Sequence, residues 1–335
     1  MPGRELLVSV SGLTKHFVYR KKFNGKPAAL LKAVDGVDLN IYRGQTLGLV
    51  GESGCGKSTL GRLLLRLHKP NSGSIVYKGI HIENLNQKEL RPLRQHIQIV
   101  FQDPYDSLNP RKTVFESVLD PLNVIGTIPR SERNAAVERI FHEVGLDESH
   151  YYKYPHELSG GQRQRVVIAR AVILNPDFIV CDEPVSALDV SIRAQILKLM
   201  IKLRQERKIT YLFISHDLSV VRYLCDTVAV MYLGKIVELG TRMEIFNNPA
   251  HPYTQALISA IPLPDVDVKI ERTILEGDIP SPVDIPPGCR FRQRCRWAIP
   301  ECARVEPALD IAISETHRSA CFRAVEIQPE TGVIL

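Results

Sequence analysis

Short apolar runs of strand length alternate with turns and with amphipathic segments along this chain. Leu47–Val50 and Phe178–Cys181 are continuous apolar runs, and two further runs end at Gln102 and Ser215. Continuous runs of this length are typical of strands buried on both faces of a sheet. The segment from about 103 to 171 instead places apolar residues at i, i+3 and i+4, as in SERNAAVERIFHEVGL. The pattern therefore predicts an α/β protein with a mostly helical segment between its strands.

The composition is that of a globular protein with a mild positive charge. The chain has 335 residues, of which 44% are hydrophobic, and a net charge of +6, and its length alone predicts about two domains. No run approaches the ~18 apolar residues that a membrane span needs, and MPGRELLVSVSGL lacks the basic-then-apolar order of a signal peptide. The mild net charge fits a protein that binds phosphate or lies near an anionic membrane surface. The basic residues are scattered and form no long block, which argues against a nucleic-acid partner. We therefore expect a cytoplasmic protein.

The first apolar run leads directly into a glycine-rich loop and an apolar helix. The loop GESGCGKS follows the pattern G-x-x-x-x-G-K-[ST] in the strand–loop–helix context that a phosphate-binding loop (P-loop) requires. Its glycines let backbone N–H groups surround an anion, and the helix presents its positive N-terminus to the same anion. Lys57 is expected to reach the β- and γ-phosphates, Ser58 to ligate Mg²⁺ and Thr59 to contact the α-phosphate. The candidate nucleotide-binding residues of this loop are Gly51, Ser53, Gly54, Cys55, Gly56, Lys57, Ser58 and Thr59.

A second helix start suited to an anion lies in YPHELSGGQRQRVVIARA. Ser159 is a natural N-cap of the amphipathic helix that follows, and Gly160 and Gly161 leave backbone N–H groups accessible. With Gln162 these residues complete LSGGQ, and together with the P-loop they resemble the ATP-binding cassette (ABC) ATPases. In that family this signature binds the γ-phosphate of the ATP held by the opposite subunit. The resemblance therefore implies that the chain carries two half-sites and works with a partner.

Two carboxylates follow the apolar run Phe178–Cys181. Asp182 stands at the end of the predicted strand, where a carboxylate can hold the Mg²⁺ shell. Glu183 resembles the catalytic carboxylate of the family, which polarises the water that attacks the γ-phosphate. Asp189 ends SALD, which resembles the family's D-loop, and the resemblance implies that it contacts the P-loop of the partner subunit.

The same resemblance assigns roles to residues in three other places. His216 in TYLFISHD is similar to the switch histidine, which contacts the γ-phosphate. Gln102 in IQIVFQDP is similar to the Q-loop glutamine, which reaches the metal and the attacking water. Phe17 in LTKHFVYR is the candidate for stacking on adenine, with Tyr19 as the alternative because the insert KKFNGKPAALL obscures the alignment. The loop PYDSLNPRKTV is expected to contact a membrane permease, with a solvated loop as the alternative.

Longer stretches narrow the resemblance to one kind of ABC ATPase. One P-loop, one signature, no membrane run and no long coiled-coil insertion leave the separate motor subunit of a transporter. GESGCGKSTLGRLLL, FQDPYDSLNPR, DEPVSALDVSIRAQIL and FNNPAHPYTQALISAIP are similar to the ATP-binding subunit, usually labelled F, of bacterial dipeptide and oligopeptide importers.

This resemblance has consequences for partners, location and cargo. It implies ATP and Mg²⁺ as ligands, a homologous ATP-binding partner (or a homodimer of the isolated chain), two membrane permeases and, indirectly, an extracytoplasmic peptide-binding protein. It places the chain peripherally at the cytoplasmic face of the membrane. Nickel, glutathione or a sugar stays open as the cargo because the motor subunit never touches it. A rival function is a cytosolic ATPase switch that responds to redox state.

The composition changes after Ala260. IPLPDVDVKIERTILEGDIPSPVDIPPG is rich in proline and acidic residues and predicts an extended linker. Four cysteines then follow at spacings wider than the C-x₂₋₄-C knuckle of structural zinc sites; they are Cys289, Cys295, Cys302 and Cys321. Four thiolates suit a [4Fe–4S] cluster, which the peptide-importer resemblance also implies, while zinc, or no metal at all, stays open.

Two further features of this cysteine segment bear on a cluster. Four arginines alternate through its first half and are expected to offset the negative charge of a cluster; they are Arg290, Arg292, Arg294 and Arg296. His317 is near enough to Cys321 in sequence to be the alternative fourth ligand.

The predicted architecture is a P-loop NTPase of the ABC cassette type. It comprises a RecA-like core with an antiparallel β subdomain and a helical subdomain, followed by a small cysteine-rich extension. We place the nucleotide-binding domain at residues 1–260, its helical subdomain at about 103–171, and the extension at 261–335.

Overall fold

The computed structural model describes residues 5–21, 27–261, 275, 277 and 280–327. The chain divides into two compact units. The first, here called the P-loop unit, comprises Met1–Ile41, Leu47–Glu83 and Ser215–Leu335, and the second, the signature unit, comprises Tyr42–Thr46 and Asn84–Ile214. The domain boundary expected at residue 260 stays a prediction, because the two units divide the chain at other positions. Most of the predicted linker 261–288 lies outside the described residues.

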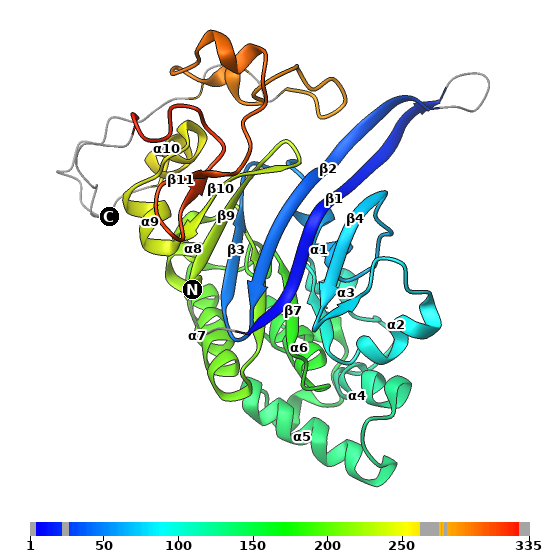
Figure 1. The fold of residues 1–335 in the computed structure, drawn as a ribbon. Coiled ribbons are helices and arrows are strands. Elements are labelled where there is room, and N and C mark those ends of the chain that lie inside the picture. Colours follow the sequence, from blue (N-terminus) through cyan, green and yellow to red (C-terminus); the bar gives the residue numbers. More distant parts are fainter. Residues whose placement is uncertain (1–4, 22–26, 262–274, 276, 278–279, 328–335) are drawn as a thin grey trace, which may run out of the picture. The chain divides into compact units, whose positions relative to one another are not determined.

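An antiparallel sheet with the order β2-β1-β4-β5 belongs to the P-loop unit. Its strands are β1 (Leu6–Lys21), β2 (Pro27–Tyr42), β4 (Ser72–Tyr77) and β5 (Ile80–His81). In Figure 1, β1 and β2 are the two long blue strands, with β4 beside them. Val8 of β1 lies opposite Tyr77 of β4, and both side chains are buried. This sheet corresponds to the antiparallel β subdomain that the sequence predicted.

The P-loop unit also contains the strand that leads into the P-loop. This strand, β3 (Thr46–Val50), is buried along its whole length and pairs in parallel with β9 (Thr227–Tyr232). β9 pairs antiparallel with β10 (Lys235–Thr241), β10 with β12 (Arg318–Ser319), and β12 with β11 (Ile311–Ala312). Two short strands near the C-terminus thus continue the sheet that carries the P-loop. The helices of this unit are α1 (Lys57–Leu64), α8 (Leu218–Leu224), α9 (Arg242–Asn247) and α10 (Pro252–Ser259).

Three parallel strands and a group of helices form the signature unit. β7 (Phe178–Asp182) lies between β6 (Ile97–Val100) and β8 (Thr210–Ile214), and every residue of β7 and β8 is buried. Burial on both faces explains why these strands read as continuous apolar runs. The helices are α2 (Gln87–Leu93), α3 (Pro104–Ser107), α4 (Val114–Ile125), α5 (Arg133–Val144), α6 (Gly160–Val172) and α7 (Val190–Arg207).

The helical segment predicted between about 103 and 171 contains α3, α4, α5 and α6. α4 and α5 pack against each other and against α6. α5 buries Val137, Ile140, Phe141 and Val144, which are the positions that the i, i+3, i+4 spacing selected. Each of α4 and α5 is followed by a glycine with a left-handed backbone, Gly126 and Gly145, as is common at helix C-termini.

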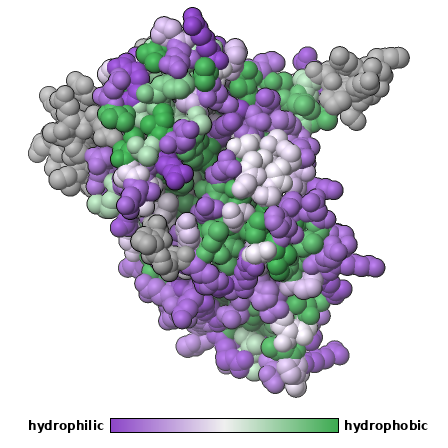
Figure 2. Space-filling view, in the orientation of Figure 1, coloured by the Kyte–Doolittle hydropathy of each residue, from purple (hydrophilic) through white to green (hydrophobic). Residues whose placement is uncertain are grey.

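The surface is mostly hydrophilic on the face drawn in Figure 2, where hydrophobic side chains are interspersed with polar ones. Within the described ranges, no helix combines the length and the apolar character that crossing a membrane requires.

Candidate functional site

The P-loop joins β3 to α1 and depends on glycine at two positions. Gly51 has φ 148° and Gly56 has φ 109°, values that L side chains rarely adopt. A Cβ at Gly51 would lie 2.1 Å from the carbonyl oxygen of Met231, and one at Gly56 would lie 1.9 Å from that of Ala33. Both contacts are far below van der Waals distance, so the loop can take this course only with glycine at both positions.

Lys57 is the first residue of α1 and points back into the loop. Its Nζ donates to the carbonyl oxygens of Gly51, at 2.7 Å, and of Glu52, at 2.9 Å, and the residue is buried. Cys55 lies beside it, and burial raises the pKa of this thiol although Lys57 acts in the opposite direction. Cys55 is therefore a buried, neutral side chain that fills space within the loop.

Glu52 connects the P-loop to two elements from the C-terminal part of the chain. Its backbone N–H donates to the hydroxyl of Tyr253 in α10 at 2.8 Å. Its carboxylate accepts two hydrogen bonds from the guanidinium of Arg294, at 2.8 and 3.0 Å. Parallel hydrogen bonds between guanidinium and carboxylate are among the stronger polar contacts in proteins.

The signature sequence forms the start of α6 as predicted. The Oγ of Ser159 accepts from the N–H of Gln162 at 3.3 Å, and the Oε1 of Gln162 accepts from the N–H of Ser159 at 2.9 Å. This is a capping box, which holds the first turn in place. A Cβ at Gly161 would lie 2.5 Å from Cγ2 of Ile192, so glycine permits the close approach of α6 and α7.

The strand end of β7 places Asp182 and Glu183 next to the Q-loop. Asp182 is buried, and Glu183 follows it with φ 48°, a left-handed conformation that is uncommon for a residue other than glycine. The N–H of Glu183 donates to the carbonyl of Ile214 at 3.0 Å, which fixes the backbone there. Gln102, just after β6, donates from Nε2 to Oε2 of Glu183 at 3.0 Å. Strained backbone at a carboxylate is common at catalytic positions.

The remaining candidates occupy exposed or half-buried positions. His216 is exposed and precedes α8, where Asp217 caps the helix by accepting from the N–H groups of Ser219 and Val220. Asp189 is exposed at the start of α7.

The two candidates for stacking on adenine lie on β1. Phe17 is half-buried, with its ring edge-on to His68 at 5.8 Å, and Tyr19 is 58% exposed. Phe17 as the residue that stacks on adenine, with Tyr19 as the alternative, stays a prediction.

Each unit carries part of the predicted set. Phe17, the P-loop and His216 belong to the P-loop unit. Gln102, Asp182, Glu183, Asp189 and the signature belong to the signature unit. The roles of these residues toward ATP and Mg²⁺ stay predictions.

The four C-terminal cysteines lie close to one another in one small module, residues 288–324, here called the cysteine module. The N–H of Cys289 donates to the carbonyl of Cys302 at 2.8 Å. Burial raises the pKa of Cys289 to about 12 and that of Cys321 to about 11, and neighbouring thiols add to both shifts. All four are free thiols. In the part of the chain that the structure describes, however, no three His, Cys, Asp or Glu side chains are arranged to hold a metal ion.

Two of the four arginines expected to offset a cluster's charge are bound to carboxylates of other elements. Arg290 is buried, and its guanidinium bonds to Asp35 of β2 and to Glu306. Arg294 bonds to Glu52, while Arg296 lies over the ring of Trp297 with 5.1 Å to its centroid. The contacts of Arg290 and Arg294 attach the module to β2 and to the P-loop, and the expected role of the arginines toward a cluster stays a prediction.

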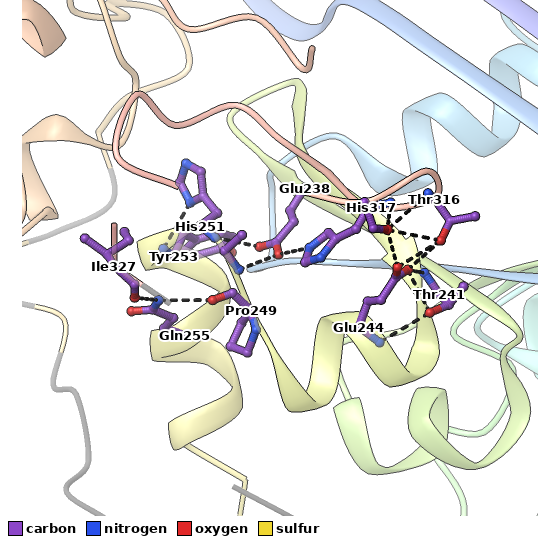
Figure 3. A network of polar contacts seen from close by, with 12 residues as sticks. Glu238, Thr241, Glu244, Pro249, His251, Tyr253, Gln255, Thr316, His317 and Ile327 are labelled. Atoms are coloured by element: carbon purple, nitrogen blue, oxygen red, sulfur yellow. Dashed lines mark hydrogen bonds and ion pairs between the residues drawn. The ribbon is translucent and has the colours of Figure 1, made fainter. Parts of the chain in front are cut away.

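A buried polar network attaches the end of the cysteine module to β10 and α10 (Figure 3). The carboxylate of Glu238 is fully buried and accepts from the N–H groups of Ala250 and His251, at 2.7 and 2.9 Å. The Nε2 of His317 lies 2.7 Å from Oε1 of the same carboxylate. This nitrogen of His317, the alternative ligand, is thereby engaged with Glu238.

The P-loop, the capped signature helix and the carboxylate pair after β7 define an ATP-binding cassette. The ABC transporter family matches residues 34–186, which include all three. The C-terminal region of oligopeptide/dipeptide transporters matches residues 237–302, which include three of the four cysteines. Solved structures agree: the cassette MJ0796 bound to ADP and Pi has a TM-score of 0.63 at 30% identity and covers 70% of this chain and 99% of its own. CbiO1 from Clostridium perfringens, part of an ABC transporter complex, has a TM-score of 0.62 at 31% identity and covers 72% of this chain and 91% of its own.

Curated relatives match over nearly the whole length. The oligopeptide transport ATP-binding protein AppF of Bacillus subtilis (strain 168) is 50% identical over 95% of this chain and 98% of its own. The dipeptide transport ATP-binding protein DppF of Escherichia coli (strain K12) is 50% identical over 90% of both chains. The chain therefore belongs to the ATP-binding subunits of dipeptide and oligopeptide ABC importers, and it is an ATPase. This confirms the resemblance found in the sequence.

The sequence alone did not indicate the contacts made by Glu52, Tyr253 and Arg294. Glu52 occupies a variable position of the P-loop pattern. Arg294, which binds its carboxylate, lies 242 residues further along the chain. No local pattern connects them. The sequence did show an acidic residue in the loop and several arginines around Cys295, and these were the only hints of an ion pair between the two segments.

Proposed function

We propose that the chain is the ATP-hydrolysing motor subunit that drives peptide uptake through partner membrane permeases. The observation that carries this proposal is the joint presence of a complete cassette and the peptide-transporter C-terminal region in one chain. The subunit would pair with a homologous ATP-binding subunit at the cytoplasmic face of the membrane. Two permeases and a peptide-binding protein would complete the importer.

The residues of the chain support a division of labour in phosphoryl transfer. Lys57 and the N–H groups of the P-loop would bind the phosphates, and the start of α6 would bind the γ-phosphate of the partner's ATP. Ser58, Asp182 and Gln102 offer the oxygen donors that Mg²⁺ prefers. Glu183 would orient the attacking water and accept its proton, while the bond between the γ-phosphorus and the bridging oxygen breaks and ADP leaves.

Coupling to transport would follow from the shared nucleotide. ATP held between the P-loop of one subunit and the signature of the other closes the pair, and hydrolysis removes the bridging phosphate. Asp189 and its neighbour Val190, which is 80% exposed, are available for this contact between subunits.

The loop 104–114 would receive the permease. It contains α3, and Tyr105 is 46% exposed with the guanidinium carbon of Arg163 4.5 Å from its ring centroid. An exposed aromatic supported by a cation from α6 would present an amphipathic contact next to Gln102, so a permease could act directly on the Q-loop.

Reconstitution tests the function and the cargo together. The complete importer, with its permeases and second ATPase subunit, is placed in proteoliposomes and its ATPase rate is measured with the binding protein and dipeptides or oligopeptides. Stimulation by peptide supports the proposal. Stimulation only by nickel, glutathione or a sugar would assign another cargo, and an ATPase that ignores the permeases but responds to redox state would favour the cytosolic switch.

We further propose that Cys289, Cys295, Cys302 and Cys321 hold a [4Fe–4S] cluster, with zinc as the alternative. The support is chemical: four free thiols lie near one another in one module. The pKa values of Cys289, Cys295 and Cys321 are raised by burial, so a bound metal ion would have to displace protons from these thiols. The test is the visible spectrum and the iron, sulfide and zinc content of the full chain purified without oxygen, repeated with Cys289→Ser. No metal in either preparation would end this part of the proposal.

A further inference from the structure

We propose that Arg294 is a positioning residue for nucleotide binding: it neutralises Glu52 and holds the P-loop in its phosphate-binding conformation. This inference goes beyond the transport function, because it concerns how a residue of the cysteine module acts on the nucleotide site within a single chain.

The contact between the two residues is bidentate and shielded from water. Nη1 and Nη2 of Arg294 donate to Oε2 and Oε1 of Glu52, at 2.8 and 3.0 Å. The side chain of Arg294 is only 7% exposed and that of Glu52 22%. An ion pair with this geometry and shielding is far less weakened by solvent than a surface pair.

Glu52 is the residue through which this contact reaches the rest of the loop. Its N–H is bound by the hydroxyl of Tyr253, and its carbonyl oxygen accepts from Nζ of Lys57. Its carboxylate, carbonyl and N–H are therefore all fixed, by the cysteine module, α1 and α10 respectively. A shift of the Glu52 side chain would move the backbone that Lys57 also contacts.

The backbone that carries Arg294 is packed against a cluster of buried aromatic side chains. Arg294 ends a short 3₁₀ turn, Arg292–Arg294, that follows Phe291. The ring of Phe291 is 2% exposed and packs against Tyr232, Tyr253 and His251, with centroids 5.3, 5.5 and 5.7 Å away. Tyr253 therefore contacts Phe291 through its ring and the P-loop through its hydroxyl.

The far end of the module is fixed independently. His317 reaches the buried carboxylate of Glu238, and the hydroxyl of Thr316 donates to Glu244 (Figure 3). The module is thus attached to β10, α9 and α10 at one end and to the P-loop at the other. These attachments restrict the movement of Arg294 and therefore of the loop residue that it binds.

Charge gives a second reason for the arrangement. A phosphate-binding loop that contains a carboxylate would repel the polyphosphate of a nucleotide. Arg294 offsets that charge within the chain, so the positive N-terminus of α1 and Lys57 can act on the phosphates without this opposition.

Binding measurements on charge variants can distinguish neutralisation of Glu52 from a merely structural role of Arg294. MgADP is titrated calorimetrically into the full chain, with Arg294→Met, Glu52→Gln and the double variant compared with wild type. Arg294→Met leaves Glu52 unpaired and is expected to raise the Kd for MgADP about tenfold, within the range of coupling measured for close charge pairs. Removing the charge of Glu52 as well is expected to recover at least about threefold of that loss.

Two further variants complete the design. Arg294→Lys keeps the charge without the paired geometry and should lie between wild type and Arg294→Met. Arg296→Ala removes an exposed arginine two residues away that contacts Trp297, and it should bind MgADP like wild type. In the assembled importer, Arg294→Met should raise KM for ATP and change kcat less than about twofold.

Three results would overturn the proposal. The first is an unchanged Kd for a folded Arg294→Met. The second is a double variant that binds no better than Arg294→Met, which would mean that Arg294 only supports folding. The third is an equal loss in Arg296→Ala, which would indicate a general effect of charge in the module. Melting curves of all variants establish that each chain is folded.

Discussion

Gln102 donates a hydrogen bond from Nε2 to Oε2 of Glu183 across 3.0 Å, so the Q-loop amide and the proposed water-activating carboxylate are in direct contact. Both residues follow strands that pair directly and in parallel in the sheet: Gln102 comes after β6 and Glu183 after β7. The left-handed backbone at Glu183 turns the chain at this point. A shift of the Q-loop would therefore move the hydrogen bond that orients the carboxylate.

Glu183→Gln should leave ATP binding intact and stall hydrolysis. The amide keeps nearly the same shape but cannot accept a proton from water, and loss of a general base typically costs about 100-fold or more in rate. The ATPase rate of the assembled importer and the Kd for ATP measure the two effects. Glu206→Gln, an exposed carboxylate on α7, is the matched control. A rate near wild type for Glu183→Gln would remove this residue from the mechanism.

Gln102→Glu should slow hydrolysis at neutral pH and move the acidic limb of the pH–rate profile upward. A second carboxylate about 3 Å from Glu183 raises the pKa of the pair, because two adjacent negative charges repel. The base is then protonated over a wider pH range. The measurement is kcat against pH for wild type, Gln102→Glu and Gln102→Ala. An identical lower limb in all three would contradict the contact.

Gly56→Ala should abolish nucleotide binding, whereas Gly54→Ala should weaken it only modestly. The new Cβ at Gly56 would collide with the carbonyl of Ala33, but the space at Gly54 is open and only its φ of 80° opposes a side chain. A left-handed alanine costs on the order of 1–2 kcal/mol. Calorimetric titration with MgADP ranks the two variants, and equal affinities would contradict this loop geometry.

His251→Asn should remove part of the loss of stability in acid. Burial lowers the pKa of His251 to about 3, so the folded state holds the neutral ring while the unfolded chain binds a proton below about 6.5. The stabilisation is therefore complete above pH 6.5 and declines as the pH falls toward 3, by about 1.4 kcal/mol per unit for one proton.

Asparagine suits this test because Nδ1 of His251 caps α10 by accepting from the N–H of Tyr253 at 3.1 Å, and asparagine can accept there as well. Urea unfolding of the full chain at pH 7.5, 6 and 5 gives the free energy of unfolding of both proteins. The difference between wild type and His251→Asn should shift in favour of the variant as the pH falls. A constant difference would show that His251 does not titrate on unfolding.

Sequence patterns predicted those elements that are determined by residues close together in the chain. The P-loop, the capped start of α6 at Ser159 and the periodic face of α5 each depend on residues within a few positions of one another. The apolar runs of β3, β7 and β8 reflected burial on both faces. These signals were sufficient to predict the cassette.

The parts that were not predicted depend on long-range contacts. Sequence indicated four arginines around the cysteines but not that Arg290 reaches Asp35, 255 residues away, or that Arg294 reaches Glu52. Strands β11 and β12 are two residues long and carry no periodic signal. They exist because the edge of β10 pairs with them, which only the folded chain provides.

The pairing of His317 with Glu238 has a consequence for the synthesis of the protein, because the two residues are far apart in the sequence. Glu238 is synthesised 79 residues before His317, so β10 is made before its neighbour β12. Until then the carboxylate of Glu238 lacks one of its hydrogen-bond partners, and an unmade hydrogen bond of a buried polar group typically costs about 1–3 kcal/mol. A chain that ends early, through a nonsense codon or a damaged message, keeps that defect permanently. Truncation before His317 should therefore lower the free energy of unfolding of the cassette, because the final segment completes a contact of its core.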